Sequence, residues 1–158
     1  MLKARALTAL LMLPLFLTAL FYLPNDGWMV FVAFILLIAW DEWLRLTKID
    51  GIPGRVLGSL IFIATLLALL WLKPVVWFVA IASLCLWLLI LLATFFVQNG
   101  YLWSSSFRRL SGLLVLASAW WIICWLRVQW YGTWWTLGFL CIVWLADVGA
   151  YVAGKQFG

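Results

Sequence analysis

The sequence predicts an all-α, polytopic integral membrane protein with about six transmembrane helices and a cytoplasmic N-terminus. Of its 158 residues, 69% are hydrophobic and only 9% are charged, and the mean hydropathy is +1.20. This leaves too little polar surface to cover a soluble domain of this size. Apolar runs long enough to cross about 30 Å of hydrocarbon recur along the chain. Most basic residues also fall on one side of the resulting membrane map.

Six apolar runs, with their flanking residues, are long enough to span a membrane. They extend from Leu7 to Leu23, Trp28 to Leu46, Val56 to Leu72, Val75 to Val97, Leu110 to Leu126 and Trp134 to Ala153. We expect a turn over Pro24 to Gly27, a loop over Asp50 to Gly54 and a break at Pro74. The longest polar stretch is Gln98 to Arg109, and no gap fits a separate soluble domain. Residues 1–158 therefore form one transmembrane portion.

The first run has a basic start and an apolar core, as a signal peptide does. No small-x-small cleavage site follows the core, and a second apolar run begins almost at once. The sequence therefore predicts a retained first helix.

The basic residues predict the orientation. With a cytoplasmic N-terminus, eight of the ten lie inside, and only Lys73 and Arg127 lie outside. The inside residues are Lys3, Arg5, Arg45, Lys48, Arg55, Arg108, Arg109 and Lys155. Because they are scattered between apolar runs, the net charge of +5 does not indicate a nucleic-acid partner. Arg108 and Arg109 are expected to mark topology, and contact with anionic lipid headgroups remains an alternative.

Asp147 is the only one of the five acidic residues that cannot be placed in a loop or at the end of an apolar run. An ionisable group at membrane depth costs about 2.5 to 3.5 kcal/mol on translocon scales, so it requires a partner or a function. A purely structural carboxylate would be satisfied by an arginine or by backbone donors. The helix dipole disfavours a carboxylate near a helix C-terminus, whereas a cation would stabilise it there. Carboxylate oxygens suit magnesium, which proteins often hold with one or two carboxylates and substrate phosphates.

Two further residues lie near Asp147 on the predicted helix. Tyr151 is four residues further on, and Lys155 is about 12 Å away along the axis at 1.5 Å per residue. Lys155 is either a snorkelling interfacial lysine or an ammonium that binds phosphate. Small residues recur every three or four positions and predict a seam for a second helix. They are Ala146, Gly149, Ala150, Ala153 and Gly154.

The other acidic cluster is Asp41 and Glu42, at the cytoplasmic end of the second run. Arg45 follows them by four and three residues. We expect ordinary pairs on the surface of one helix.

The segment from Ile142 to Tyr151, continuing from Gly154 to Gly158, resembles the middle motif of bacterial phosphatidate cytidylyltransferases, also called CDP-diacylglycerol synthases. The start, Met1-Leu2-Lys3-x-Arg5, and the segment Ala39 to Leu46 are similar to the opening of that family. The resemblance implies transfer of CMP from CTP to phosphatidic acid at the cytoplasmic face of the bacterial inner membrane. Magnesium is the implied cofactor, and the remaining partners are membrane lipids, with a homodimer allowed.

The resemblance also implies residue roles. Asp147 would be the catalytic residue and metal ligand, while Tyr151 and Lys155 would bind substrate. Val148 departs from the family pattern, which usually has Ser or Thr after the motif aspartate. A hydroxyl that could contact metal or phosphate is therefore missing.

The family continues beyond the matching Phe-Gly with further spans and a signature that contains Lys-Arg, several aspartates and His-Gly-Gly. We therefore expect this chain to be the N-terminal portion of a longer enzyme and to be inactive alone. One alternative is a polyprenol or phytol kinase. Another is a small transporter or scaffold that uses Asp147 for a cation or proton. A transporter predicts an internal repeat and a second interrupted helix with a matching charge, and the sequence contains neither.

Overall fold

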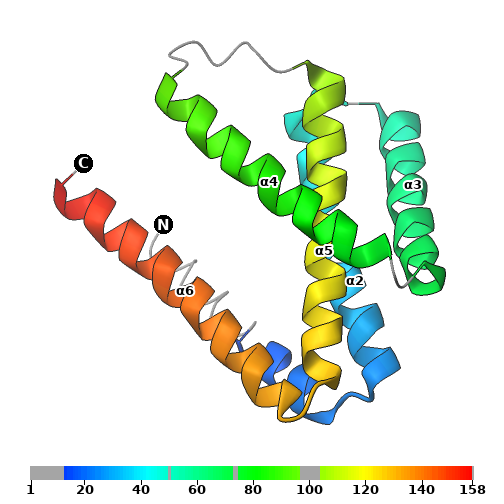
Figure 1. The fold of residues 1–158 in the computed structure, drawn as a ribbon, viewed down its shortest axis with the longest axis vertical. Coiled ribbons are helices and arrows are strands. Elements are labelled where there is room, and N and C mark those ends of the chain that lie inside the picture. The colour runs from blue at the N-terminus through cyan, green and yellow to red at the C-terminus, as the bar shows by residue number, and fades with distance from the viewer. Residues whose placement is uncertain (1–12, 50, 73–74, 97–103, 158) are drawn as a thin grey trace. The chain divides into compact units, whose positions relative to one another are not determined.

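The structure, a computed structural model, describes residues 13–49, 51–72, 75–96 and 104–157. Within these ranges every regular element is an α-helix (Figure 1). The first helix is described over Leu13–Tyr22. The others are α2 (Asn25–Leu46), α3 (Ile52–Trp71), α4 (Val75–Phe96), α5 (Ser105–Val128) and α6 (Gly132–Phe157). Each predicted span coincides with one of these helices, which confirms the all-α prediction.

Several predicted residues lie outside the described ranges. They are the basic residues Lys3, Arg5 and Lys73, the break at Pro74, Asp50, and the first part of the polar stretch, residues 98–103. Gly158 and the part of the first span before Leu13 also lie outside them.

Three connections are shorter than predicted because helices begin earlier in the polar segments. The turn over Pro24 to Gly27 is wrong from Asn25 onward, where α2 begins and where the amide of Trp28 donates to the Pro24 carbonyl at 2.8 Å. The loop over Asp50 to Gly54 ends at Ile52, since α3 begins there with a proline in its first turn. Proline fits that position because its missing N–H has no partner in the first turn anyway.

The polar stretch before α5 is also partly helical. Ser104 accepts a hydrogen bond on its Oγ from the amide of Phe107 at 3.2 Å, and its carbonyl accepts one from the amide of Arg108 at 3.1 Å. This is an N-cap, which satisfies an amide that has no partner within the helix. Arg108 and Arg109 therefore lie in the first turns of α5, rather than in a loop.

Length and hydropathy identify three described helices that could cross a membrane. They are Ile52–Trp71, Ser105–Val128 and Gly132–Gln156, while Leu13–Tyr22 and Trp77–Leu92 are shorter apolar helices. Many large apolar side chains on these helices are exposed, including Leu60 at 58% and Phe78 at 74%. Such continuous exposed apolar surface is expected on helices that face lipid.

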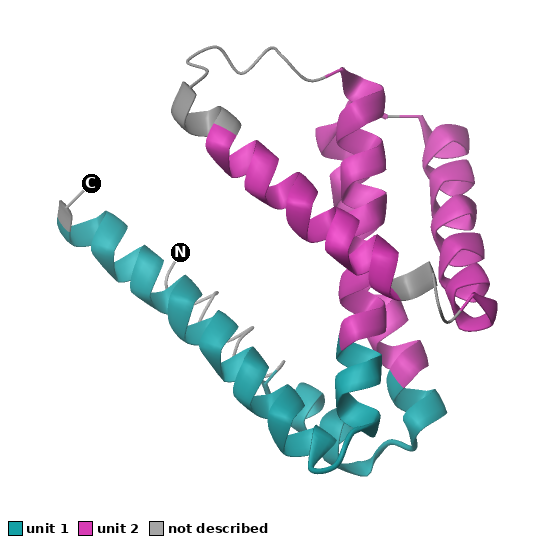
Figure 2. Ribbon diagram, viewed as in Figure 1, with its two compact units in different colours: residues 1–28, 123–158 teal, residues 29–122 magenta. Residues whose placement is uncertain are grey.

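The chain divides into two compact units (Figure 2). Unit 1 comprises residues 1–28 and 123–158, and unit 2 comprises residues 29–122.

In unit 1, aromatic side chains join the first helix to α6. Phe16 meets Trp144 edge-on with ring centroids 5.9 Å apart, and Phe21 meets Trp134 at 5.3 Å. Edge-to-face arrangements of this kind are favoured by the ring quadrupoles. Phe16 also contacts Trp28, which is almost fully buried.

In unit 2, α2 packs against both α3 and α5. The indole of Trp40 donates to the Gly58 carbonyl at 2.9 Å and stacks on Phe62, which is fully buried. On the α5 side, the Trp43 indole donates to the Arg108 carbonyl at 2.9 Å and the Trp120 indole donates to the Met29 carbonyl at 3.0 Å. This pairing order shows that α2 and α5 are antiparallel. Ser83 joins α4 to α5 by donating to the Leu114 carbonyl at 3.2 Å.

Candidate functional site

All three predicted site residues lie on α6, which is helical without interruption from Gly132 to Phe157. Asp147, Tyr151 and Lys155 follow one another at intervals of four residues, and 3.6 residues per turn place them on one face. Lys155 lies about 12 Å from Asp147 along the axis at 1.5 Å per residue. All three side chains are exposed, Tyr151 to 47%. The structure therefore confirms that the three residues lie on one continuous helix, and their roles stay a prediction.

The contacts of unit 1 determine where this face lies. Trp144 is seven residues before Tyr151, two helical turns, so the two side chains project from the same side of α6. Trp144 packs against Phe16 of the first helix. The site residues thus continue the side of α6 that contacts the first helix.

A tight turn sets the start of α6. Tyr131 adopts a left-handed conformation with φ of 56°, and the Gly132 amide donates to the Gln129 carbonyl at 2.7 Å. A Cβ at Gly132 would overlap the backbone carbonyls of Arg127 and Leu126, so only glycine fits this close approach. One turn later the fully buried Thr136 donates its hydroxyl to the Gly132 carbonyl at 2.8 Å. These contacts fix the end of α6 that is remote from Asp147.

Asp147 receives no hydrogen bond or ion pair from the part of the chain that the structure describes. The arginine or backbone donors that a structural carboxylate requires are therefore not supplied by these residues. An exposed carboxylate is, in contrast, free to bind a cation or a substrate group. The adjacent Val148 is 59% exposed and offers no oxygen ligand.

Asp147 is the single predicted protein ligand for magnesium. No group of three or more His, Cys, Asp or Glu side chains within the described ranges could hold a metal ion. Magnesium is commonly bound through one or two carboxylates together with substrate phosphates and water. Asp147 fits that mode, in which most of the remaining ligands are phosphate oxygens.

The predicted helix-packing seam of α6 has no neighbour among the described residues. A Cβ added at Gly149 or Gly154 would meet no atom within 4 Å. The small residues from Ala146 to Gly154 are all exposed. The seam stays a prediction.

The second acidic cluster is more than the expected pair within one helix. Asp41 does pair with Arg45 four residues later, at 3.2 Å. It also accepts two hydrogen bonds from Arg55 of α3, one from Nε at 2.7 Å and one from Nη2. Sequence spacing missed Arg55 because it lies across the connection between two helices. The two arginines identify Asp41 as a structural anchor between α2 and α3.

Comparisons with known proteins confirm the family resemblance. The model of the cytidylyltransferase family matches residues 3–158. A curated relative from Pseudomonas aeruginosa named phosphatidate cytidylyltransferase is 36% identical over 162 aligned residues. The alignment covers all of this chain and 59% of that relative, so the chain spans about three fifths of the relative's length. No solved structure shows a significant match.

Proposed function

Because this chain belongs to the cytidylyltransferase family, we propose that it forms part of a membrane enzyme that transfers CMP from CTP to phosphatidate. The observation that carries the proposal is the 36% identity along the whole chain to a relative with that name. The exposed face of α6 with Asp147, Tyr151 and Lys155 supplies residues of the required chemistry.

The proposed reaction is a direct displacement at phosphorus. An oxygen of the phosphatidate phosphate attacks the α-phosphorus of CTP and forms a new phosphoanhydride bond. The bond from the α-phosphorus to the oxygen bridging to the β-phosphate breaks, and pyrophosphate leaves with the electron pair. The products are CDP-diacylglycerol and pyrophosphate, and no covalent enzyme intermediate is needed. Such transfers are catalysed chiefly by positioning the reactants and stabilising the charge on the phosphates.

We assign roles on the α6 face accordingly. Asp147 would hold magnesium, Lys155 would bind a phosphate as a point charge, and Tyr151 would shape the site between them. When bound, magnesium neutralises charge on the phosphate oxygens and orients them. Asp147 and Lys155 lie about 12 Å apart along the axis, so one extended substrate such as a nucleoside triphosphate could contact both.

The proposed location is the cytoplasmic face of a bacterial inner membrane, where CTP is present. The distribution of basic residues supports a cytoplasmic Lys155 through the positive-inside rule. Phosphatidate would enter from the surrounding lipid, and a homodimer is compatible with this arrangement.

A chimaera provides the test. In it, these 158 residues replace the matching residues of the Pseudomonas aeruginosa relative, so the remaining part of a complete enzyme is supplied. Membranes containing the chimaera are incubated with CTP, phosphatidate and magnesium, and the lipid product is identified by mass spectrometry. We expect CDP-diacylglycerol, and we expect none from the 158 residues alone.

Substitutions at Asp147 test the assigned site. Asp147→Asn removes the charge with little change of shape and should abolish activity while membrane insertion is unchanged. Asp147→Glu keeps the carboxylate and should retain partial, magnesium-dependent activity. Wild-type activity in Asp147→Asn would make Asp147 a structural residue. A phosphorylated polyprenol or phytol as the product, in place of CDP-diacylglycerol, would replace the proposed reaction with a lipid kinase reaction.

A further inference from the structure

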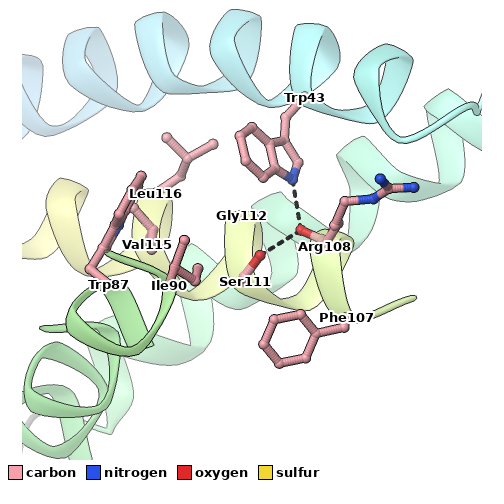
Figure 3. A pocket seen from close by; sticks show the side chains of 9 residues that line it. All are labelled: Trp43, Trp87, Ile90, Phe107, Arg108, Ser111, Gly112, Val115 and Leu116. Carbon is pink, nitrogen blue, oxygen red and sulfur yellow. Dashed lines mark hydrogen bonds between the residues drawn. The ribbon is translucent and has the colours of Figure 1, made fainter. Parts of the chain in front are cut away.

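Unit 2 contains a pocket of about 340 Å³ that the proposed reaction does not use. This volume is within the range of about 300 to 1,000 Å³ typical of sites for small molecules. Three helices line it, as Figure 3 shows. The lining residues are Trp43 of α2, Trp87 and Ile90 of α4, and Phe107, Arg108, Ser111, Gly112, Val115 and Leu116 of α5. Nearly all of this surface is aromatic or aliphatic.

On the α2 side of the pocket, Trp43 is held in place by a carbonyl that also accepts a hydrogen bond from a second lining residue. The Arg108 carbonyl accepts hydrogen bonds from the Trp43 indole at 2.9 Å and from the Ser111 hydroxyl at 2.8 Å (Figure 3). Gly112 allows the indole to lie this close, because a Cβ there would overlap the Trp43 ring. The Trp43 indole and the Ser111 hydroxyl therefore both bond to the Arg108 carbonyl, and the wall around them is mostly apolar.

One edge of the pocket is cationic. In Figure 3 the Arg108 guanidinium points away from Trp87 and Ile90, which lie on the other side of Trp43. Its Nε is buried and has no hydrogen-bond partner among the described residues. Buried polar atoms in native structures are almost always paired, so this atom can take an acceptor from an occupant of the pocket. The Nε of Arg109 is also buried and unpaired among the described residues, but Arg109 does not line the pocket. The N-terminus of α5 adds partial positive charge at the same place.

Along α5, the pocket extends from the level of lipid headgroups to the level of lipid acyl chains. Arg108 lies in the first turn of a helix that is long and apolar enough to cross a membrane, and is therefore at headgroup level. Leu116 lies about 12 Å further along the axis at 1.5 Å per residue, within the hydrocarbon region. An occupant with an anionic end and an apolar chain satisfies both parts of the pocket.

We infer that this pocket binds one acyl chain of an anionic phospholipid, with its phosphate on the Arg108 guanidinium. A zwitterionic or neutral lipid would fill the apolar part but would bring no net negative charge to the guanidinium. A nucleotide would place several charges on an apolar wall. The inference does not depend on the proposed function, because binding can be measured without CTP.

Competitive lipid binding to the full 158-residue chain provides the test. The purified chain in detergent is mixed with equal amounts of dioleoyl phosphatidylglycerol, phosphatidate and phosphatidylcholine, and bound lipids are counted by native mass spectrometry. We expect both anionic lipids to be retained about tenfold more than phosphatidylcholine, because their headgroups carry net negative charge, whereas the choline of phosphatidylcholine offsets the charge of its phosphate. Soluble glycerol 3-phosphate, which has no acyl chain, should not displace them.

Two variants and a matched control locate the binding. Arg108→Gln should reduce retention of the anionic lipids to the level of phosphatidylcholine. Arg109→Gln removes an adjacent charge that does not line the pocket and should leave most of the preference intact. Val115→Trp fills the apolar part and should reduce retention of all three lipids, with helicity checked by circular dichroism.

Equal retention of the three lipids by the unmodified chain would overturn the inference. Equal effects of Arg108→Gln and Arg109→Gln, or displacement by glycerol 3-phosphate, would also overturn it. A chimaera that makes no CDP-diacylglycerol, with the lipid preference intact, would refute only the proposed function.

Discussion

Arg127, in the last turn of α5, donates two hydrogen bonds to the backbone carbonyl of Leu20, from Nε at 3.2 Å and from Nη2 at 2.9 Å. Nη2 also donates to the Leu23 carbonyl at 2.7 Å, and Nη1 donates to Asn25 Oδ1 at 3.1 Å. Carbonyls in the last turn of a helix have no partner within it. One guanidinium therefore caps the first helix and joins it to α5. Trp28 lies beneath it, with the ring centroid 5.2 Å from Cζ.

Replacing this arginine should destabilise unit 1. Arg127→Gln loses the fork of donors and the cation–π contact, and we expect it to lower the free energy of unfolding by about 2 kcal/mol. Arg127→Lys keeps the charge but cannot reach the same carbonyls together, so its loss should be about half as large. Thermal unfolding in detergent, followed by circular dichroism, measures both. Equal melting temperatures for Arg127→Gln and the unmodified chain would show that the cap is replaced by water.

The two arginines on Asp41 should differ in their contribution to stability. The Arg55 pair joins two helices through two hydrogen bonds, and its side chain is 25% exposed. The Arg45 side chain is 59% exposed and pairs within one helix. We expect Arg55→Gln to lower the melting temperature more than Arg45→Gln does.

A double-mutant cycle with Asp41→Asn isolates the two pair energies. Its melting temperatures are measured under the same detergent conditions. A coupling to Arg45 as large as that to Arg55 would contradict the assignment of Asp41 as an anchor between α2 and α3.

A methyl group at Gly112 should disrupt the contact between α2 and α5. The added Cβ would overlap the Trp43 indole, so the ring would have to move and lose its hydrogen bond to Arg108. We expect Gly112→Ala to destabilise the chain by about 1 to 3 kcal/mol, as overpacking usually does.

Gly138→Ala is the matched control, because its Cβ would meet nothing within 4 Å. Alanine is a better helix former by about 1 kcal/mol, so this variant should be as stable as the unmodified chain or more stable. Equal melting temperatures for the two variants would contradict the close approach of Trp43.

The sequence predicts the helices well because apolar runs determine them, but it predicts their ends poorly. Leu110 to Leu126 is the expected span, whereas α5 begins at Ser105 because the Ser104 cap stabilises the preceding polar turn. Hydropathy does not detect caps, so it places the polar first turn in a loop.

The two sites also differ in how well the sequence predicts them. The face with Asp147, Tyr151 and Lys155 follows from helical spacing, which is a local property. The pocket at Arg108 depends on a hydrogen bond between residues 65 positions apart, and on a glycine that fits one particular ring. One signal points to a part of it, namely the basic pair Arg108 and Arg109 at a membrane boundary, and Trp43 lies on a different helix. No sequence pattern indicated that they meet.

Val148 offers the sharpest test of the α6 face, because valine and threonine have nearly the same shape. The family resemblance places a hydroxyl residue after the aspartate, and Val148 is 59% exposed beside Asp147. We expect Val148→Thr in the chimaera to raise kcat/KM for CTP by about fivefold, through one added hydrogen bond or ligand to phosphate or magnesium. The gain should shrink when Asp147 is replaced by Glu, since that carboxylate lies differently. Initial rates over a range of CTP and magnesium concentrations measure both effects. An unchanged rate for Val148→Thr would show that residue 148 lies away from the reacting phosphates. If Asp147→Asn also kept the same magnesium dependence, Asp147 would not be a magnesium ligand.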